Sequence, residues 1–244
     1  MQTPATLSWV GRRVPGMSRT GLADAARDAL AAHAEPGAAV AMQAYMKSAM
    51  PFRGVAKPAR ERLLRGLVGD HPLPDAPALL AEVRDLWDGA RYREERYLAL
   101  AVVGQPRYRG WAETSWVTDL FQGWVVDGGW WDFTDEIATR HVGPLVRAHR
   151  MQPLMRTWSV HPDRWLRRTS VICQLSTKAD TDLALLTDAI EANLGDPDFF
   201  LRKGIGWALR QHARIDPAWV LRFVDAHPDL SPLSRREALK HLTP

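Results

Sequence analysis

The chain has 244 residues, of which 46% are hydrophobic, enough to bury one sizeable core but not two independent domains. Its formal net charge is +4, its sequence pI is about 9.5, and most of its 32 basic residues are arginine. The planar guanidinium suits phosphate, so we expect an anionic partner. Cys173 is the single cysteine, which excludes an internal disulfide and a cysteine-based metal cluster.

Signals for export or membrane insertion are missing from the sequence pattern. Residues 1–16 carry Arg12 and Arg13 but no apolar run long enough for a signal peptide. No later run approaches the ~20 apolar residues of a membrane span. We therefore expect a soluble, cytoplasmic protein with no membrane partner.

In chain order the pattern predicts one helix after another, without the sustained alternation that a strand needs. Residues 1–20 form a predicted loose arm with two prolines, and residues 21–244 form a single helical domain. Prolines and short polar turns separate the helices, so neighbours should pack antiparallel. The predicted helices are Gly21–His33, Gly37–Met50, Pro58–Val68, Pro77–Trp87, Tyr92–Val103, Glu113–Val126, Trp130–His141, Pro144–His149, Gln152–Val160, Asp163–Leu175, Thr181–Leu194, Phe199–His212, Pro217–Ala226 and Ser234–Leu242.

The succession of similar helices predicts an all-α fold of repeating helix pairs. No strict repeat period is visible, but helix pairs joined by short turns are typical of a degenerate, curved α-solenoid. The inner face of such an array is a long groove that suits an extended ligand, either a nucleic acid duplex or a peptide. A compact globular bundle is the alternative architecture.

The stretch Gly128–Asp135 brings two indoles and two carboxylates to the start of one predicted helix. Trp130 begins an apolar stripe that suits the core. Trp131 and Asp135 lie one turn apart on the neighbouring stripe, so an indole and a carboxylate point the same way. A half-buried tryptophan with a solvated aspartate behind it is the alternative. Asp132, in the first turn, is assigned to the helix dipole.

The helix Asp163–Leu175 carries a cation where a core residue is expected, because Arg168 falls on its apolar stripe. An unpaired buried charge would cost several kcal/mol. Arg168 therefore needs a partner, and the sequence offers either a carboxylate such as Asp135 or a phosphate.

The helix Phe199–His212 carries a large indole outside its core stripe, where Trp207 lies with Lys203 and Arg210 on the polar side. An indole among cations suits a stacking or covering surface. The alternative is a tryptophan that packs on the next helix with lysine stems around it. The remaining tryptophans fit apolar stripes and are expected in the core: Trp87, Trp111, Trp116, Trp124, Trp158, Trp165 and Trp219.

Several ordered runs together resemble a known family. These runs are Gly129–Ala138, Trp165–Thr169, Gly204–Arg210 and Ser231–Lys240, with Tyr45, Met46, Lys47, Pro51, Phe52 and Gly54 before them. Over about residues 41–242 they resemble the DNA alkylation repair family of AlkD-like alkylpurine DNA glycosylases. The resemblance implies an α-solenoid of HEAT-like repeats whose basic concave face holds duplex DNA. It also implies excision of N3- and N7-alkylated purines without flipping of the base.

The resemblance assigns roles to particular residues of this chain. It places the catalytic carboxylate at Asp135, the tryptophans of the groove at Trp131 and Trp207, and the groove arginine at Arg168, with Arg167 as the other possible register. The cations expected at DNA phosphates are Arg168, Arg167, Lys203, Arg210, Arg235, Arg236, Lys47 and Arg53. We expect a monomer near the nucleoid whose partner is double-stranded DNA containing alkylated purines.

The chemistry of the expected reaction needs few groups. Alkylation at N3 or N7 gives the purine a positive charge, so it leaves without a general acid and a two-carboxylate site is unnecessary. One carboxylate, Asp135, can stabilise the oxocarbenium-like sugar and orient or deprotonate the attacking water. The indoles of Trp131 and Trp207 exclude water and favour cationic character by ~1–2 kcal/mol.

Two other functional classes fit parts of the pattern. A non-catalytic helical-repeat adaptor for DNA or protein would not need Asp135. A small-molecule glycosidase would need a second carboxylate facing Asp135, and no stretch clearly supplies one. The eight histidines are scattered without ligand spacing, so neither a metal site nor another cofactor is expected.

Overall fold

The computed structural model describes residues 21–242, so the predicted arm 1–20 lies outside the described residues. Within that range every regular element is a helix, and no strand occurs. The α-helices are α1 Leu22–Ala32, α2 Pro36–Met46, α3 Lys57–Asp70, α4 Ala76–Asp88, α5 Arg93–Val103, α6 Gln122–Gly128, α7 Trp131–Glu136, α8 Gly143–His149, α9 Gln152–Ser159, α10 Arg164–Ile172, α11 Leu183–Glu191, α12 Phe199–His212, α13 Pro217–Ala226 and α14 Pro232–Leu239. The 3-10 helices are η1 Pro106–Trp111 and η4 Lys178–Asp180, and the π-helices are η2 Val117–Phe121 and η3 Ile137–Val142.

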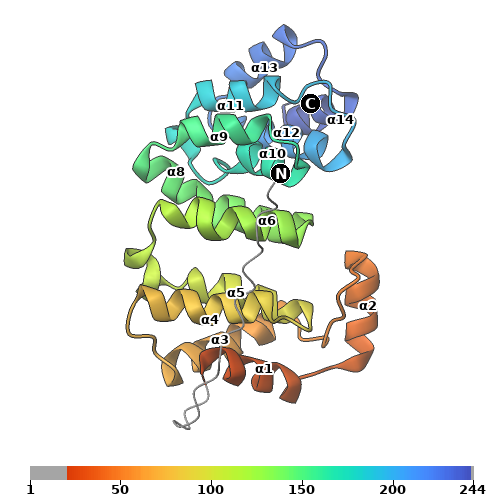
Figure 1. Ribbon diagram of the computed structural model, residues 1–244. Coiled ribbons are helices and arrows are strands. Elements are labelled where there is room, and N and C mark those ends of the chain that lie inside the picture. The colour runs from red at the N-terminus through yellow and green to blue at the C-terminus, as the bar shows by residue number, and fades with distance from the viewer. Residues whose placement is uncertain (1–20, 243–244) are drawn as a thin grey trace, which may run out of the picture.

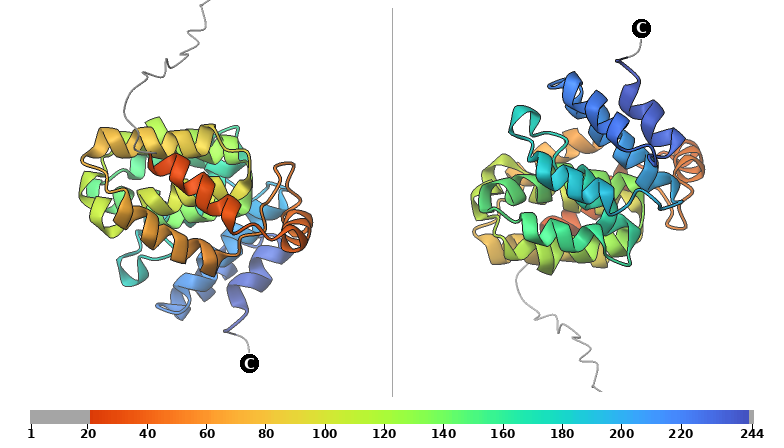
Figure 2. Two further views of the ribbon diagram at one scale, coloured as in Figure 1. Left: turned by 90° about the horizontal axis from the view of Figure 1, so that it is seen from below. Right: turned by 90° about the horizontal axis from the view of Figure 1, so that it is seen from above.

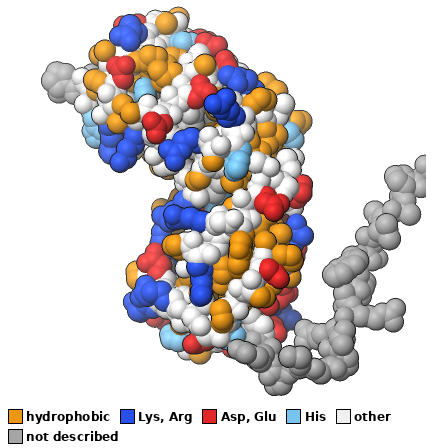
Figure 3. Space-filling model, turned by 90° about the vertical axis from the view of Figure 1, so that its left-hand side faces the viewer, with side chains coloured by type: hydrophobic (Ala, Val, Ile, Leu, Met, Phe, Trp, Pro, Cys, Tyr) orange, Lys and Arg blue, Asp and Glu red, His pale blue; other side chains and the backbone are white. Residues whose placement is uncertain are grey.

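The helices stack in successive layers from α1 at one end to α13 at the other, and α14 packs beside α12 (Figure 1). Views along the stack place α2 and the C-terminal helices α12–α14 on the same side of it (Figure 2). The molecular surface is C-shaped, and lysine and arginine side chains gather on both sides of the hollow (Figure 3). The architecture is the predicted curved all-α solenoid, and the alternative of a compact bundle is excluded.

The core runs through the stack as two neighbouring clusters of buried side chains. The helix α10 joins them, because Leu166 belongs to the larger cluster and Ile172 to the smaller one. In the larger cluster Trp87 of α4 stacks on Trp124 of α6 with ring centroids 4.6 Å apart. Most tryptophans expected in the core are buried, whereas Trp111 and Trp219 are partly buried and pack against the clusters.

One predicted break in the chain of helices is wrong. The expected helices Trp130–His141 and Pro144–His149 form one uninterrupted helical run over residues 131–149. Its middle is π-helical, and the amide of Gly143 donates to the carbonyl of Ala138, five residues earlier. Pro144 has no amide hydrogen to donate, and the wider π-turn lets it follow within the same helix. A π-turn has no simple sequence signal.

The helix α2, Pro36–Met46, ends four residues before the predicted boundary at Met50. Lys47 ends it by adopting a left-handed conformation with φ of 49°. Only Met46 of its side chains is buried, whereas Val40 and Tyr45 are 72% and 78% exposed. The helix therefore projects from the stack and contributes little to the core (Figure 1).

The loop after α2 is fixed by a buried carboxylate. Glu94 at the start of α5 has no exposed surface and accepts hydrogen bonds from the amides of Arg53, Gly54 and Val55. These charge-assisted bonds satisfy an acidic group that would otherwise be costly to bury. The loop that carries the predicted DNA ligand Arg53 is thus held by α5.

A substitution at Gly143 tests the packing of this helical run on α10. A Cβ at Gly143 would lie 2.1 Å from the carbonyl oxygen of Cys173, so Gly143→Ala should lower the free energy of unfolding by ~1–3 kcal/mol. Gly66, exposed in α3 with open space around it, is the control, and Gly66→Ala should raise stability by ~0.5–1 kcal/mol. Urea unfolding followed by circular dichroism measures both. A Gly143→Ala protein as stable as wild type would contradict the described packing.

Candidate functional site

The chain turns sharply between α6 and α7, and this turn sets the direction of α7, the site helix, which carries Asp135. Gly129 adopts a left-handed conformation with φ of 48°, and the extended Trp130 then precedes α7 as its N-cap. Of the predicted core stripe, Phe133 and Ile137 are buried. Trp130 is half-buried, and its ring packs edge-on against Phe200 at 5.3 Å between centroids.

The centre of the site is an ion pair between α7 and α10. Arg168 donates from Nε to Asp135 Oδ1 at 2.7 Å and from Nη2 to Oδ2 at 2.9 Å. Its Nη1 donates to the backbone carbonyl of Phe200, at the start of α12. The Arg168 side chain is 5% exposed and that of Asp135 is 17% exposed. Of the partners that the sequence offered, the structure selects the carboxylate.

The neighbouring arginine turns to a different partner. Arg167 donates to Asp196 at 2.7 Å and to the carbonyl of His161 at 2.8 Å. Arg168, and not Arg167, therefore shares the site with Asp135.

Burial raises the pKa of Asp135 above its ordinary value of 3.8. The hydrogen bonds and charge of Arg168 act against this rise, whereas the nearby carboxylate of Asp132 adds to it. The ionised form of Asp135 depends on its arginine partner, so the two side chains act as one unit.

Close packing of α12 makes room for this pair. A Cβ at Gly204 would lie 2.8 Å from Arg168 Nη1, and a Cβ at Gly206 would lie 2.5 Å from the Cβ of Glu237. Glycine at these positions lets α12 approach α10 on one side and α14 on the other. Trp207, next along α12, is half-buried and packs against the smaller core cluster.

A carboxylate from α14 holds the two cations beside Trp207. Glu237 Oε1 accepts from Lys203 Nζ at 2.5 Å, and its other oxygen accepts from Arg210. Hydrogen bonding to Lys203 is the largest influence that lowers the pKa of Glu237. The polar face predicted around Trp207 therefore exists, but its cations are paired within the protein.

The remaining predicted DNA ligands fall into two groups. Arg53 lies 3.7 Å from Glu95, and Arg235 donates to two backbone carbonyls near the end of α13. Lys47 and Arg236 are exposed, and their side chains make no hydrogen bond or ion pair within residues 21–242. Binding of DNA by any of these side chains stays a prediction, as does the placement of Trp131 and Trp207 on one concave face.

A second ion pair on α7 was not predicted from the sequence. Asp132 does lie in the first turn, as a dipole partner would, but it also accepts from Arg93 Nη2 at 2.7 Å and from the Tyr97 hydroxyl at 2.5 Å. Arg93 and Tyr97 are four residues apart on α5 and so share a face. That spacing was readable from the sequence, but their partner on α7 was not.

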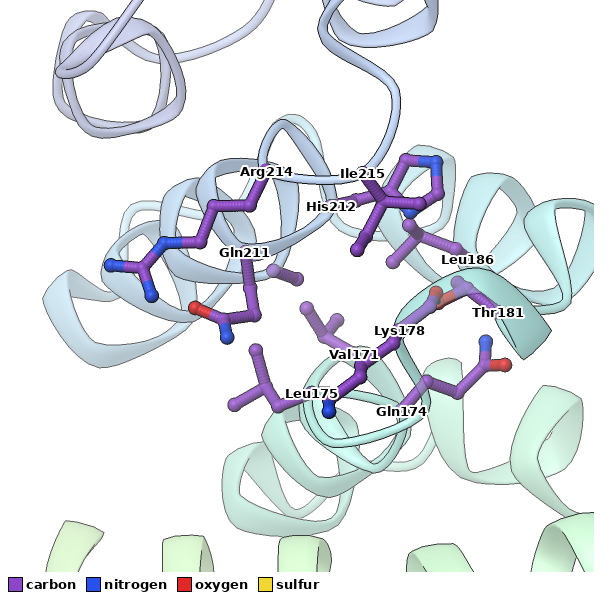
Figure 4. A pocket seen from close by; sticks show the side chains of 11 residues that line it. Val171, Gln174, Leu175, Lys178, Thr181, Leu186, Gln211, His212, Arg214 and Ile215 are labelled. Atoms are coloured by element: carbon purple, nitrogen blue, oxygen red, sulfur yellow. The ribbon is translucent and has the colours of Figure 1, made fainter.

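A cavity of about 190 Å³ lies apart from these pairs, between α10, α11 and α12 (Figure 4). Lys178, Gln211 and Arg214 line it together with His212, whose two ring nitrogens have no hydrogen-bond partner. None of the predicted site residues lines it.

Residues 21–242 contain no group of three or more His, Cys, Asp or Glu side chains placed to hold a metal ion. In the same range, no helix has both the length and the apolar character needed to cross a membrane.

The pKa of Glu237 leads to a testable dependence of stability on pH. Because the folded state lowers this pKa from 4.5, ionised Glu237 stabilises the fold at neutral pH, and that contribution is lost as the pH falls through the lowered value. Glu237→Gln should therefore cost ~1–3 kcal/mol near neutral pH, and the difference from wild type should close under acid conditions. Urea unfolding at both pH values measures it. A deficit of equal size at both would contradict the assignment.

With this geometry established, comparisons with known proteins identify the family. A family model described as DNA alkylation repair enzyme matches residues 26–242. Among solved structures, a predicted DNA alkylation repair enzyme from Enterococcus faecalis is 30% identical, with a TM-score of 0.77, over 86% of this chain and 97% of that one. A search of curated proteins gave no match. The chain belongs to the DNA alkylation repair enzyme family.

Proposed function

We propose that this protein is a DNA glycosylase that hydrolyses the N-glycosidic bond of purines alkylated at N3 or N7 in duplex DNA. The observation that carries the proposal is the Asp135–Arg168 pair, a partly exposed carboxylate held by two hydrogen bonds from a buried guanidinium. Its family supports alkylation repair in general. A carboxylate of this kind supports cleavage of a glycosidic bond in particular.

In the proposed reaction the C1′–N bond breaks and its electron pair neutralises the cationic purine, which leaves without protonation. Positive charge then develops on the sugar, where the carboxylate of Asp135 stabilises it. Arg168 uses one lone pair of each Asp135 oxygen, so the remaining lone pairs can accept a hydrogen bond from water. That water adds to C1′ and passes a proton to the Asp135 carboxylate as the new C–O bond forms, and Asp135 then releases the proton to solvent.

Recognition in this proposal works through the sugar and the backbone. The half-exposed indoles of Trp131 and Trp207 are assigned to the deoxyribose and its neighbours, and the cations beside the hollow are assigned to phosphates (Figure 3). The lesion then stays in or near the duplex, and no deep pocket for a flipped base is required. The partner is duplex DNA, bound with little preference for sequence.

Asp135→Asn tests the proposed mechanism, because it keeps the size of the side chain and removes its charge. Single-turnover release of 7-methylguanine, corrected for spontaneous depurination, should fall by roughly 100-fold or more. Binding of DNA should hold or tighten, since a repulsive charge is lost. Trp131→Ala and Trp207→Ala should reduce excision less, because the indoles shape the site without carrying its charge.

The controls separate catalysis from folding and from binding. Circular dichroism confirms that each variant is folded, and fluorescence anisotropy with the same duplex measures its Kd. Equal excision by wild type and Asp135→Asn would refute the mechanism and favour a non-catalytic DNA-binding adaptor.

The proposed DNA contacts predict a steep dependence of affinity on salt. The logarithm of the affinity should fall linearly with the logarithm of salt concentration, by about 0.9 for each phosphate neutralised. Arg236→Gln should make this slope shallower by about 0.9, the value for one phosphate contact. Glu237→Gln should strengthen binding, because it frees Lys203 and Arg210 for phosphate. Fluorescence anisotropy across a salt series measures these changes, and an affinity that is independent of salt would contradict the phosphate contacts.

A further inference from the structure

We propose that Asp132 is a second positioning carboxylate of the site. Together with Arg93 and Tyr97 of α5, it fixes the first turn of α7 and thereby orients Asp135. The catalytic consequence of this inference rests on the glycosylase function proposed above. Its structural part concerns only the position and surroundings of Asp135.

The cluster that Asp132 forms with Arg93 and Tyr97 is held as a rigid unit. Arg93 donates to both oxygens of Asp132, at 2.7 and 3.4 Å, and its guanidinium lies 4.1 Å from the ring centroid of Phe133. The side chains of Arg93 and Asp132 are 7% and 12% exposed. Burial raises the pKa of Tyr97, so its hydroxyl stays protonated and remains a donor to Asp132. These side chains have little freedom to move separately.

The site helix needs such an external anchor because its own start is weak. Asp and Ser side chains cap helices such as α4, α10 and α14, but Trp130 precedes α7 and gives it no side-chain cap. A missing cap costs a helix typically ~1 kcal/mol. The bonds of Asp132 to α5 hold the first turn of α7 from outside and set its rotation. Asp135, three residues later on the same short helix, takes its direction from that rotation.

The ion pairs that Asp132 and Asp135 form link α7 to two other parts of the molecule, the loop after α2 and the start of α12. On one side, Arg93 donates to Ser48 Oγ at 3.2 Å, in the loop that follows α2. On the other side, Arg168 connects Asp135 to the carbonyl of Phe200. The site helix is thus held between segments that carry predicted DNA ligands.

Stability alone is a poor explanation for the cluster. A buried ion pair is often no more stabilising than well-packed apolar residues of similar volume. The apolar alternative would lack the directional bonds that fix Asp132 in one orientation. A positioning role uses this directionality.

The charges around Asp135 give the proposal a distinctive readout. Arg168 of α10 faces Asp135 directly, and the Asp132 carboxylate raises its pKa. Behind Asp132 lie Arg93 of α5 and the guanidinium of Arg60 of α3, which is 4.4 Å from the Tyr97 ring centroid. Asp132→Asn removes the negative charge and leaves Arg93 uncompensated. Both changes should lower the pKa of Asp135.

The experiment compares Asp132→Asn with Asp127→Asn, a control at a more exposed ion pair. Asp127 also accepts from an arginine, Arg96 at 2.7 Å, and from an aromatic donor, the Trp87 indole at 2.8 Å, but it lies on α6. Asp132→Asn should slow single-turnover release of 7-methylguanine about tenfold, below the ~100-fold that a 1 Å misplacement can cost, with the Kd for DNA unchanged. Asp127→Asn should excise at the wild-type rate.

Loss of the Asp132 charge should by itself move the titration of Asp135, so the variant that isolates positioning is Tyr97→Phe, which keeps every charge. In Asp132→Asn the acid limb of the excision profile should move to lower pH, and so should the carboxyl titration of Asp135 followed by carbon-13 NMR. Tyr97→Phe keeps the packing and removes one donor, so it should give a smaller change in the same rate, and it decides the matter if Asp132→Asn does not fold.

The outcomes distinguish this inference from the proposed function. If wild type excises but Asp132→Asn matches the Asp127→Asn control in rate and in the titration of Asp135, the inference fails alone. If wild type releases no base, the proposed function fails. The NMR titration then decides the inference by itself, because an unchanged Asp135 signal would overturn it.

Discussion

The burial of one positive charge, that of Arg168, is the constraint on which the centre of this structure depends. A guanidinium that is 5% exposed must find acceptors within the protein, because leaving it unpaired would cost several kcal/mol. The acceptors come from Asp135 of α7 and Phe200 of α12. Three helices must therefore meet at one point, and Gly204 leaves the space for them to do so.

This constraint connects the fold with the proposed chemistry. The requirement to neutralise Arg168 places Asp135 in a partly dry environment, where an electrostatic interaction is stronger than in water. The hydrogen bonds and charge of Arg168 act against the rise in the pKa of Asp135 that burial causes. A second pair, Asp132 with Arg93, extends the arrangement to α5, so that the short helix α7 is held from both sides.

Several of the basic side chains that give the chain its positive charge are paired with carboxylates of the protein. Glu237 pairs with Lys203 and Arg210, and Arg167 pairs with Asp196. Exposed cations such as Arg236 have no carboxylate partner among residues 21–242, so no ion pair there offsets their charge. To contact DNA phosphates, Lys203, Arg210 and Arg167 would exchange their carboxylate partners for phosphates.

The sequence by itself determined the local features of this protein. The bounds of α12 and α13 are as predicted, because an aspartate caps each helix and a proline opens α13. Helical spacing likewise placed Arg168 on an apolar stripe. Only the tertiary structure decided the π-turn before Pro144, the choice of Asp135 as the partner of Arg168, and the pairing of Asp132 with α5. The physical reason is that helical periodicity relates residues within about a turn of one another, whereas these ion pairs join helices that meet only after packing.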